Sequence, residues 1–357
     1  MSKVTWLDKL QEQVNIDIDC MDPAEAKRFL PFKPHDQTSN QRLVYEQMIS
    51  PENRGLFLKT VEEGKDEGWE IILDRTSALL CAKNIDNIQG RVLLQTSAFH
   101  AYDTGKVVSQ ARSYAREFEK LGISKDRICI KIPCTGPALN ASPILLKEGI
   151  CTLGTSLFSV AQAIAASQAE TLSISPTTTF LGIIPTESSG PILKTRLSNI
   201  LCHPGSYKSS TSTNAFEKRL VRRNHSSNQQ GSFISAREAM AMAELSCDHA
   251  TIPEDILLQL SLLDAEASPP PGSDTHRKIG TPSQRLAHLA KVDPLAGPDW
   301  SGLPALDIDY LADNGAALTE AITADTVTKR GLDQALEAFK ANELQSREAI
   351  EKALKLF

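Results

Sequence analysis

A lysine lies in the middle of a short apolar stretch, residues 127–135, and could carry nucleophilic chemistry. Ile128, Ile130 and Ile132 alternate along this stretch, which predicts a buried strand and places Lys131 on its opposite face. An unpaired buried ammonium is costly, so burial favours a lowered pKa and a neutral amine. Such an amine can attack a carbonyl and form a Schiff base. The alternative is a lysine at a strand end that reaches solvent or forms a salt bridge.

Two carboxylates lie on a second alternating stretch, residues 14–19, near the N-terminus. Asn15, Asp17 and Asp19 share one face, and apolar residues form the other. In a barrel of parallel strands the polar face of this strand points inward, and Asp19 lies at the carboxyl-terminal rim, where active sites form. We therefore expect Asp19 rather than Asp17 to take part in acid–base chemistry.

Strands and helices that alternate along the chain must position these side chains. The expected strands are residues 14–19, 91–98, 127–135, 150–155, 172–175 and 249–252, with a short polar strand end at 36–40. The expected helices begin at 22 and 42 and span 3–13, 54–67, 75–87, 105–120, 138–147, 157–168, 235–245, 254–263, 307–322 and 328–355. This alternation is typical of an α/β fold with parallel strands. About eight strand–helix units predict a single (β/α)8 TIM barrel with additional terminal helices.

One domain over residues 1–357 is expected, with two less regular segments. Residues 186–231 are rich in Ser, Thr, Asn and Gln, which predicts a variable, loop-rich segment with one helix at 191–201. Residues 265–305 read as an irregular connection. Residues 307–357 are expected to form C-terminal helices that pack on the barrel.

Composition excludes several classes of partner. The net charge of -6 disfavours a nucleic-acid partner, and the basic cluster at 218–223 reads as a solvated loop. No apolar run approaches membrane-spanning length. Seven scattered cysteines without a recognisable signal peptide favour a reducing, cytoplasmic location. Four histidines, at 100, 203, 225 and 249, lack metal-ligand spacing and read as ordinary structural or surface residues, so neither a metal nor a cofactor is expected.

Several motifs together resemble the transaldolase family of lysine-dependent aldolase-type (β/α) barrels. They are residues 128–135, 36–40, 145–150, 157–162 and 174–176. The resemblance runs along nearly the whole chain and is weakest in 186–231 and 265–305. The motif at 36–40 departs from the family pattern because Gln41 replaces its proline.

The resemblance implies a role for individual residues. Lys131 would be the Schiff-base lysine, Asp19 the acid/base, and Thr155 the threonine that holds a catalytic water. The substrate-binding residues that the matching motifs imply are Asn40, Ser175, Thr38, Phe158 and Ser232. For Thr155 and Ser175, simple strand capping is an equally good interpretation.

Departures from the family pattern bear on the substrate. Gln95 replaces the glutamate that transaldolases carry on the third strand, and it resembles the fructose-6-phosphate aldolase branch, as does Leu153 in residues 152–155. Phe180 and Ile234 stand where the family has cations that clamp a sugar phosphate. A phosphate would then need cations from the variable segment. The candidates are Arg196, Lys208, Arg222 and Arg223.

Three functions remain open from the sequence. The resemblance favours a Schiff-base transferase or aldolase that acts on a small carbonyl substrate, diverged toward a less phosphorylated compound, in a specialised biosynthetic pathway. The alternatives are an ordinary sugar-phosphate transaldolase of the pentose phosphate pathway and an inactive barrel with a regulatory or scaffold role. A scaffold gains nothing from a buried lysine beside acids, which argues against the last. Whether the chain forms a homodimer is left open.

Overall fold

A parallel sheet organises the structure, a computed structural model that describes residues 3–176, 227–230, 233, 235–244, 247–268 and 308–357. Its strands are β1 (Asn15–Ile18), β2 (Val92–Gln95), β3 (Ile128–Pro133), β4 (Thr152–Leu157), β5 (Ser173–Pro176), β6 (Ser227–Gln230) and β7 (His249–Ile252). The strand order is β1-β7-β6-β5-β4-β3-β2, and every pair is parallel. The chain therefore has the α/β fold with parallel strands that its alternating elements predict.

The two terminal strands of this order, β1 and β2, both bond to the segment around Gln37. Gln37 forms parallel bridges with Ile18 of β1 and with Val92 of β2. The bridges are made by backbone hydrogen bonds, among them Gln37 N–H to Arg91 O at 3.0 Å and Thr38 N–H to Ile18 O at 3.0 Å. The strand end expected at 36–40 is thus a short extended segment centred on Gln37, hydrogen-bonded to β1 on one side and to the start of β2 on the other.

Strand β6 lies inside the segment for which the sequence predicts loops. Residues 227–230 pair with β5 on one side and β7 on the other, so the loop-rich interpretation of 186–231 is wrong for these four residues. Their composition, Ser-Asn-Gln-Gln, carries no apolar alternation and low strand propensity. Pairing with the strands on both sides holds these residues in a strand, although their side chains do not favour one. The helix expected at 191–201 and most of 265–305 lie outside the described residues.

Helices follow the strands as expected. They are α1 (Trp6–Gln11), α2 (Pro23–Arg28), α3 (Gln41–Ile49), α4 (Arg54–Glu63), α5 (Trp69–Ala82), α6 (Thr104–Lys120), α7 (Gly136–Leu139), α8 (Ser142–Lys147), α9 (Val160–Gln168), α12 (Ala236–Glu244), α13 (Glu254–Leu262), α15 (Ala312–Ala324) and α16 (Thr326–Leu354). The helix expected to begin at 22 is confirmed: Asp22 caps α2, with Pro23 at its first position, and Asp103 likewise caps α6. The helix expected at 138–147 is two short helices, α7 and α8, with a break at Asn140.

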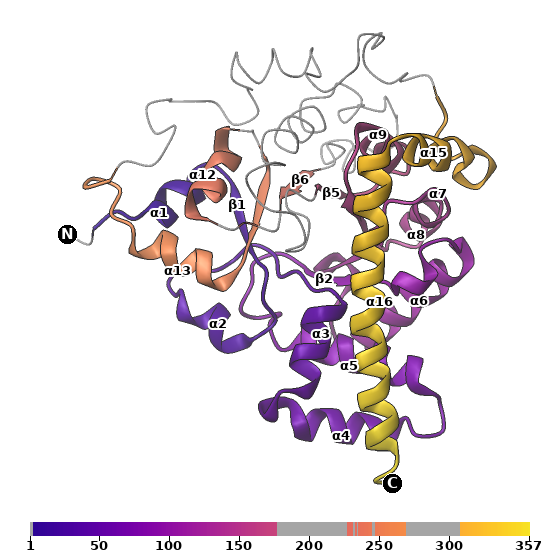
Figure 1. Ribbon diagram of the computed structural model, residues 1–357. Helices are drawn as coiled ribbons and strands as arrows, with labels where there is room; N and C mark the ends of the chain where they lie inside the picture. The colour runs from indigo at the N-terminus through magenta and orange to yellow at the C-terminus, as the bar shows by residue number, and fades with distance from the viewer. Residues whose placement is uncertain (1–2, 177–226, 231–232, 234, 245–246, 269–307) are drawn as a thin grey trace.

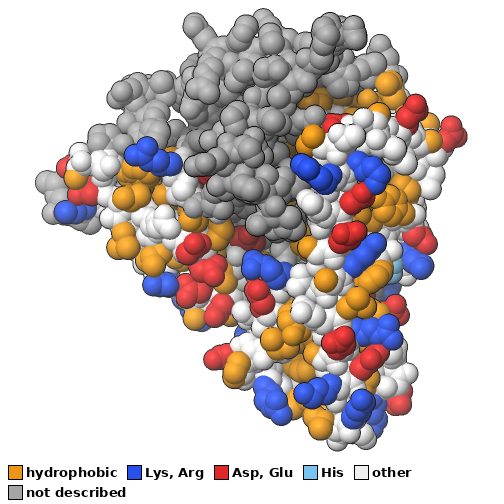
Figure 2. Space-filling model, in the orientation of Figure 1, with side chains coloured by type: hydrophobic (Ala, Val, Ile, Leu, Met, Phe, Trp, Pro, Cys, Tyr) orange, Lys and Arg blue, Asp and Glu red, His pale blue; other side chains and the backbone are white. Residues whose placement is uncertain are grey.

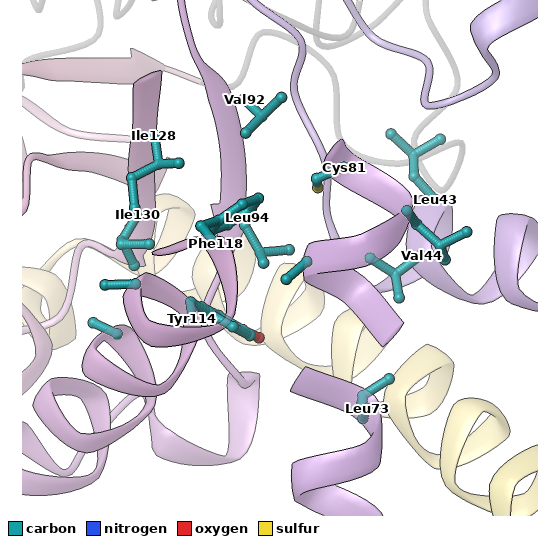
Figure 3. Close-up of a cluster of buried hydrophobic side chains, with 14 of the residues drawn as sticks. Leu43, Val44, Leu73, Cys81, Val92, Leu94, Tyr114, Phe118, Ile128 and Ile130 are labelled. Carbon is teal, nitrogen blue, oxygen red and sulfur yellow. The ribbon is translucent and has the colours of Figure 1, made fainter. Parts of the chain in front are cut away.

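The sheet has two chemically distinct faces. On the outer face, Ile128, Ile130 and Ile132 pack with residues of the surrounding helices such as Phe118 and Val44 in one buried cluster (Figure 3). On the inner face, a small apolar cluster contains Leu93, Cys129 and Leu153. Side chains that alternate with the outer isoleucines therefore point to the inner face, and Lys131 is one of them.

The C-terminal helices pack against the strand–helix units. Helix α16 runs along one side of the molecule beside α3 and α5 (Figure 1), as expected for residues 307–357. Helix α15 contacts α7 where Gly315, at φ +79°, meets Gly136. A Cβ atom on Gly136 would lie 2.4 Å from Gly315 O, so this approach requires glycine. Among the described residues, no helix combines the length and apolar character needed to cross a membrane.

Candidate active site

Lys131 lies on β3 with its side chain buried at the inner face, 7% exposed. Its Nζ donates hydrogen bonds to Thr38 Oγ1 at 2.9 Å and to Ser39 O at 3.0 Å. These contacts hold the amine over the segment that joins β1 and β2. The alternation of the stretch at 127–135 is confirmed, and the lysine does not reach solvent as the alternative interpretation required.

The environment of Lys131 favours the neutral amine. Burial lowers the pKa of Lys131 to about 8, although the Asp19 carboxylate acts in the opposite direction. At pH 7 roughly a tenth of the molecules then carry a neutral amine, far more than for an exposed lysine. A neutral amine has two N–H donors, which Thr38 and Ser39 accept, so its lone pair stays available for a carbonyl carbon.

Asp19 and Asp17 have different surroundings, as their positions on β1 predict. Asp19 directly follows the last residue of β1 and is half-buried. Burial raises the pKa of Asp19, while the Lys131 ammonium lowers it, so the two groups influence each other's ionisation. Asp17 is 1% exposed and contacts His249 Nδ1 at 3.0 Å. Of the two aspartates, Asp19 is the one whose charge acts on the lysine.

Gln95 and Thr155 lie on strands adjacent to β3. Gln95 pairs with Lys131 in the sheet register, and Thr155 pairs with Pro133, two residues further along. Both are buried, Gln95 at 2% and Thr155 at 7% exposure. The amide nitrogen and oxygen of Gln95 are buried without a hydrogen-bond partner among the described residues. An amide in this state needs a water or ligand atom, which suits a water-holding position.

Two of the predicted substrate-binding residues come from the segment after β1. Thr38 is buried and accepts the Lys131 hydrogen bond. Asn40 is the N-cap of α3, where its Oδ1 accepts from Leu43 N–H at 3.1 Å. The cap fixes the direction of the Asn40 side chain, so its orientation has a structural cause independent of any substrate.

The remaining predicted residues lie on or beyond β4 and β5. Ser175 alternates with Ile174, which packs in the outer cluster with the helices, so Ser175 points to the inner face and is partly exposed. Phe158 is buried, at 5% exposure, in the apolar cluster that contains Ile174. The structure thus gives Phe158 a packing environment and does not place it with the lysine. Ser232, Phe180 and Ile234 lie outside the described residues.

Two features of the site were not found from the sequence. The Ser39 carbonyl holds Lys131, and a backbone oxygen carries no residue-type signal. His249 and His35 meet Asp17 and Asp36 below the lysine, although the histidines read as ordinary residues. Metal ligands were expected to show a characteristic spacing along the chain. These four residues come together through the pairing of strands, which such spacing does not reveal.

Comparison with known proteins shows similarity to a family model and to curated proteins. A model of the family described as transaldolase/fructose-6-phosphate aldolase matches residues 16–350. A protein named transaldolase, from Nostoc punctiforme (strain ATCC 29133 / PCC 73102), is 32% identical over 186 residues. That alignment covers 49% of this chain and 54% of the cyanobacterial protein, so the chain spans about half the length of this curated relative.

Proposed function

The chain belongs to the transaldolase/fructose-6-phosphate aldolase family, and on that premise we propose that it makes or breaks a carbon–carbon bond through a Schiff base on Lys131. The observation that carries the proposal is the buried Lys131 amine, whose Nζ donates to Thr38 and Ser39 and whose pKa is about 8. A buried lysine without a chemical role would weaken the fold for no gain. The inactive-scaffold alternative is therefore disfavoured.

The arrangement supports the following sequence of steps. The Lys131 amine adds to a ketone carbon, and loss of water leaves a protonated imine. Asp19 takes a proton from the substrate hydroxyl next to the breaking bond, through a water held by Gln95 and Thr155. The bond electrons flow into the imine and give an enamine on Lys131, while the deprotonated hydroxyl becomes the carbonyl of an aldehyde, which leaves. Protonation and hydrolysis, or addition to an aldehyde, then release a product and restore the amine.

A substrate with little negative charge is the second part of the proposal. Phe180 and Ile234 stand where the family resemblance implies phosphate-binding cations, and neither can pair with a phosphate. The net charge of -6 gives no general attraction for an anion. The ordinary sugar-phosphate reaction of the pentose phosphate pathway is the alternative, with cations supplied from residues 196–223.

Closure of the sheet into an eight-stranded barrel is the third part of the proposal. The two bridges of Gln37 support it, because they join β1 and β2, the terminal strands of the seven-strand order. The segment around Gln37 would then be the remaining strand. A closed sheet keeps the inner face dry, which is what lowers the pKa of Lys131.

Reductive trapping tests the Schiff base. Full-length protein treated with dihydroxyacetone and borohydride should gain one adduct, which peptide mass spectrometry locates on Lys131. Trapping should become faster as the pH rises through about 8, because the neutral amine is the attacking form.

Two lysine variants complete the trapping experiment. Lys131→Met should fold, since it replaces a buried amine with an apolar chain of similar length, and should form no adduct. Lys106→Met removes an exposed lysine of α6 and should behave as wild type. Equal adduct formation by wild type and Lys131→Met would show that another group attacks the ketone.

A further inference from the structure

Four potential metal ligands meet on three neighbouring parts of the sheet. Asp17 comes from β1, His249 from β7, and His35 and Asp36 precede the bridging residue Gln37. One ligand atom from each residue can be chosen so that all four lie within 4.8 Å of one another. Asp17 and Asp36 are 1% and 3% exposed, and His249 is 8% exposed. This His2Asp2 cluster is separate from Lys131 and has no part in the chemistry proposed above.

The individual distances agree with a common centre. His249 Nδ1 lies 3.0 Å from Asp17 Oδ1, and His35 Nδ1 lies 2.9 Å from Asp36 Oδ1 and 4.0 Å from Asp17 Oδ1. A four-coordinate ion with bonds of about 2.0–2.1 Å holds its donors about 3.4 Å apart. Side-chain shifts of roughly an ångström would bring the four donors to that spacing.

One ring nitrogen of the cluster is poorly satisfied by protein atoms. His35 Nδ1 is buried, and although Asp36 is near it, no described residue gives it a hydrogen bond of good geometry. A buried nitrogen that faces two carboxylates without a directed hydrogen bond suits coordination of a cation. A cavity of about 60 Å³ borders two of the four residues, Asp36 and His249, and its lining also includes Arg91. This volume admits an ion with a bound water.

Outer contacts orient these side chains as they do in metal sites. The carboxylate of Asp17 accepts from Asp36 N–H at 3.0 Å, and that of Asp36 accepts from Arg91 N–H at 2.6 Å. His249 Nε2 lies 3.3 Å from Asn15 Nδ2, from which it can accept a hydrogen bond, and this leaves the proton of a neutral ring on Nδ1 beside Asp17. An ion bound at Nδ1 would displace that proton.

We propose that Asp17, His35, Asp36 and His249 bind one divalent transition-metal ion, with Zn²⁺ as the best fit. Two carboxylates balance the charge of the ion, so the buried site is neutral overall with neutral imidazoles. Two nitrogen and two oxygen donors in a four-coordinate arrangement favour zinc over magnesium or calcium, which take oxygen ligands. The ion would join β7 and β1 to the segment around Gln37, adding to the backbone hydrogen bonds that already connect this segment to β1.

Metal binding by untagged, full-length protein tests the site after treatment with EDTA. Titration with Co²⁺ should show one ion per chain and the visible absorption of a four-coordinate complex. Zn²⁺ should displace the cobalt and raise the melting temperature of the wild type. Asp36→Asn and His35→Gln should weaken Co²⁺ binding roughly 10- to 100-fold or more. His100→Gln is the control: it replaces a histidine that lies outside the cluster, and the variant should bind Co²⁺ as the wild type does.

Two results would overturn the site. One is a wild-type protein that binds neither ion, which would leave a hydrogen-bonded His–Asp network. The other is equal binding by wild type, Asp36→Asn and His35→Gln. X-ray absorption of the wild-type zinc complex decides the matter even if a variant does not fold: nitrogen and oxygen donors with an imidazole signature are expected. Sulfur donors would assign the ion to cysteines instead.

Discussion

At the scale of single residues, the site places two ionisable groups under opposing influences. Burial lowers the pKa of Lys131 to about 8 and raises the pKa of Asp19, so burial favours the uncharged form of both groups. Groups with pKa values near the working pH are the most effective acid–base catalysts. The proposed Schiff base would account for a buried lysine, whose burial costs free energy in the fold.

Substitution of Asp19 tests its role in proton transfer. Asp19→Asn keeps the shape of the side chain and removes the base, so turnover should fall by roughly two to four orders of magnitude. The measurement is kcat for carbon–carbon bond cleavage. Asp22→Asn is a matched control, because asparagine caps α2 as well as aspartate does.

Comparison with the neighbouring acid makes the test of Asp19 specific. Asp17→Asn removes a partner of His249 and should lower the melting temperature more than it lowers turnover of the folded protein. A large loss of turnover in Asp17→Asn, with Asp19→Asn near wild type, would assign the proton transfer to the other aspartate.

At the scale of elements, α16 is tied to the end of β2 by a buried acid. Ser97, two residues after β2, donates to Glu343 Oε1 at 2.6 Å, across 246 positions of sequence. Burial raises the pKa of Glu343 to about 7, while the Ser97 hydrogen bond acts in the opposite direction. The same helix lies along α3, whose N-cap is Asn40. The C-terminal helix therefore supports the segment that holds Lys131.

The raised pKa of Glu343 predicts how stability changes with pH. The folded protein binds this proton more tightly than the unfolded chain, so the contribution of Glu343 to stability falls as the pH rises from about 4.5 to 7. Glu343→Gln stays neutral and should raise the free energy of unfolding at pH 8 by on the order of 1 kcal/mol. Urea denaturation at pH 5 and pH 8 measures this difference.

A control on the same helix separates burial from charge. Glu348 is exposed on α16, so Glu348→Gln should change stability little at either pH. A Glu343→Gln protein that is less stable than wild type at pH 8 would show that the ionised carboxylate stabilises the contact with Ser97.

At the scale of the whole molecule, charge bears on the choice of substrate. Acidic and basic side chains are interspersed over the described part of the face seen in Figure 2, without a broad area of one sign. Together with the net charge of -6, this pattern supplies no long-range attraction for a phosphate dianion. Affinity for a phosphorylated substrate would have to come from cations within the site itself.

Substrate preference is the corresponding prediction. Cleavage of fructose should show a higher kcat/KM than cleavage of fructose 6-phosphate with erythrose 4-phosphate as acceptor. Ile234→Arg should raise kcat/KM for the phosphorylated sugar roughly 10- to 100-fold, the worth of one charge-assisted hydrogen bond. A strong wild-type preference for the phosphorylated sugar, lost in Arg222→Ala or Arg223→Ala, would identify an ordinary transaldolase instead.

Local periodicity determined much of this protein from the sequence. The alternation of Ile128, Ile130 and Ile132 placed Lys131 on the inner face, and the alternation before Asp19 placed it beyond β1. Capping residues such as Asp22 marked the starts of helices. These predictions succeed because burial repeats with period two in a strand, and because caps satisfy backbone groups within a few residues.

The tertiary structure alone decided which distant groups meet. Strand β6 has a polar sequence and exists through its pairing with β5 and β7. Gln37 bridges β1 and β2, and this places Thr38 and Ser39 against Lys131. The pairing of β1 with β7 brings His249 to Asp17 across 232 positions. Such contacts depend on the order and register of strands, which side-chain periodicity along one segment does not specify.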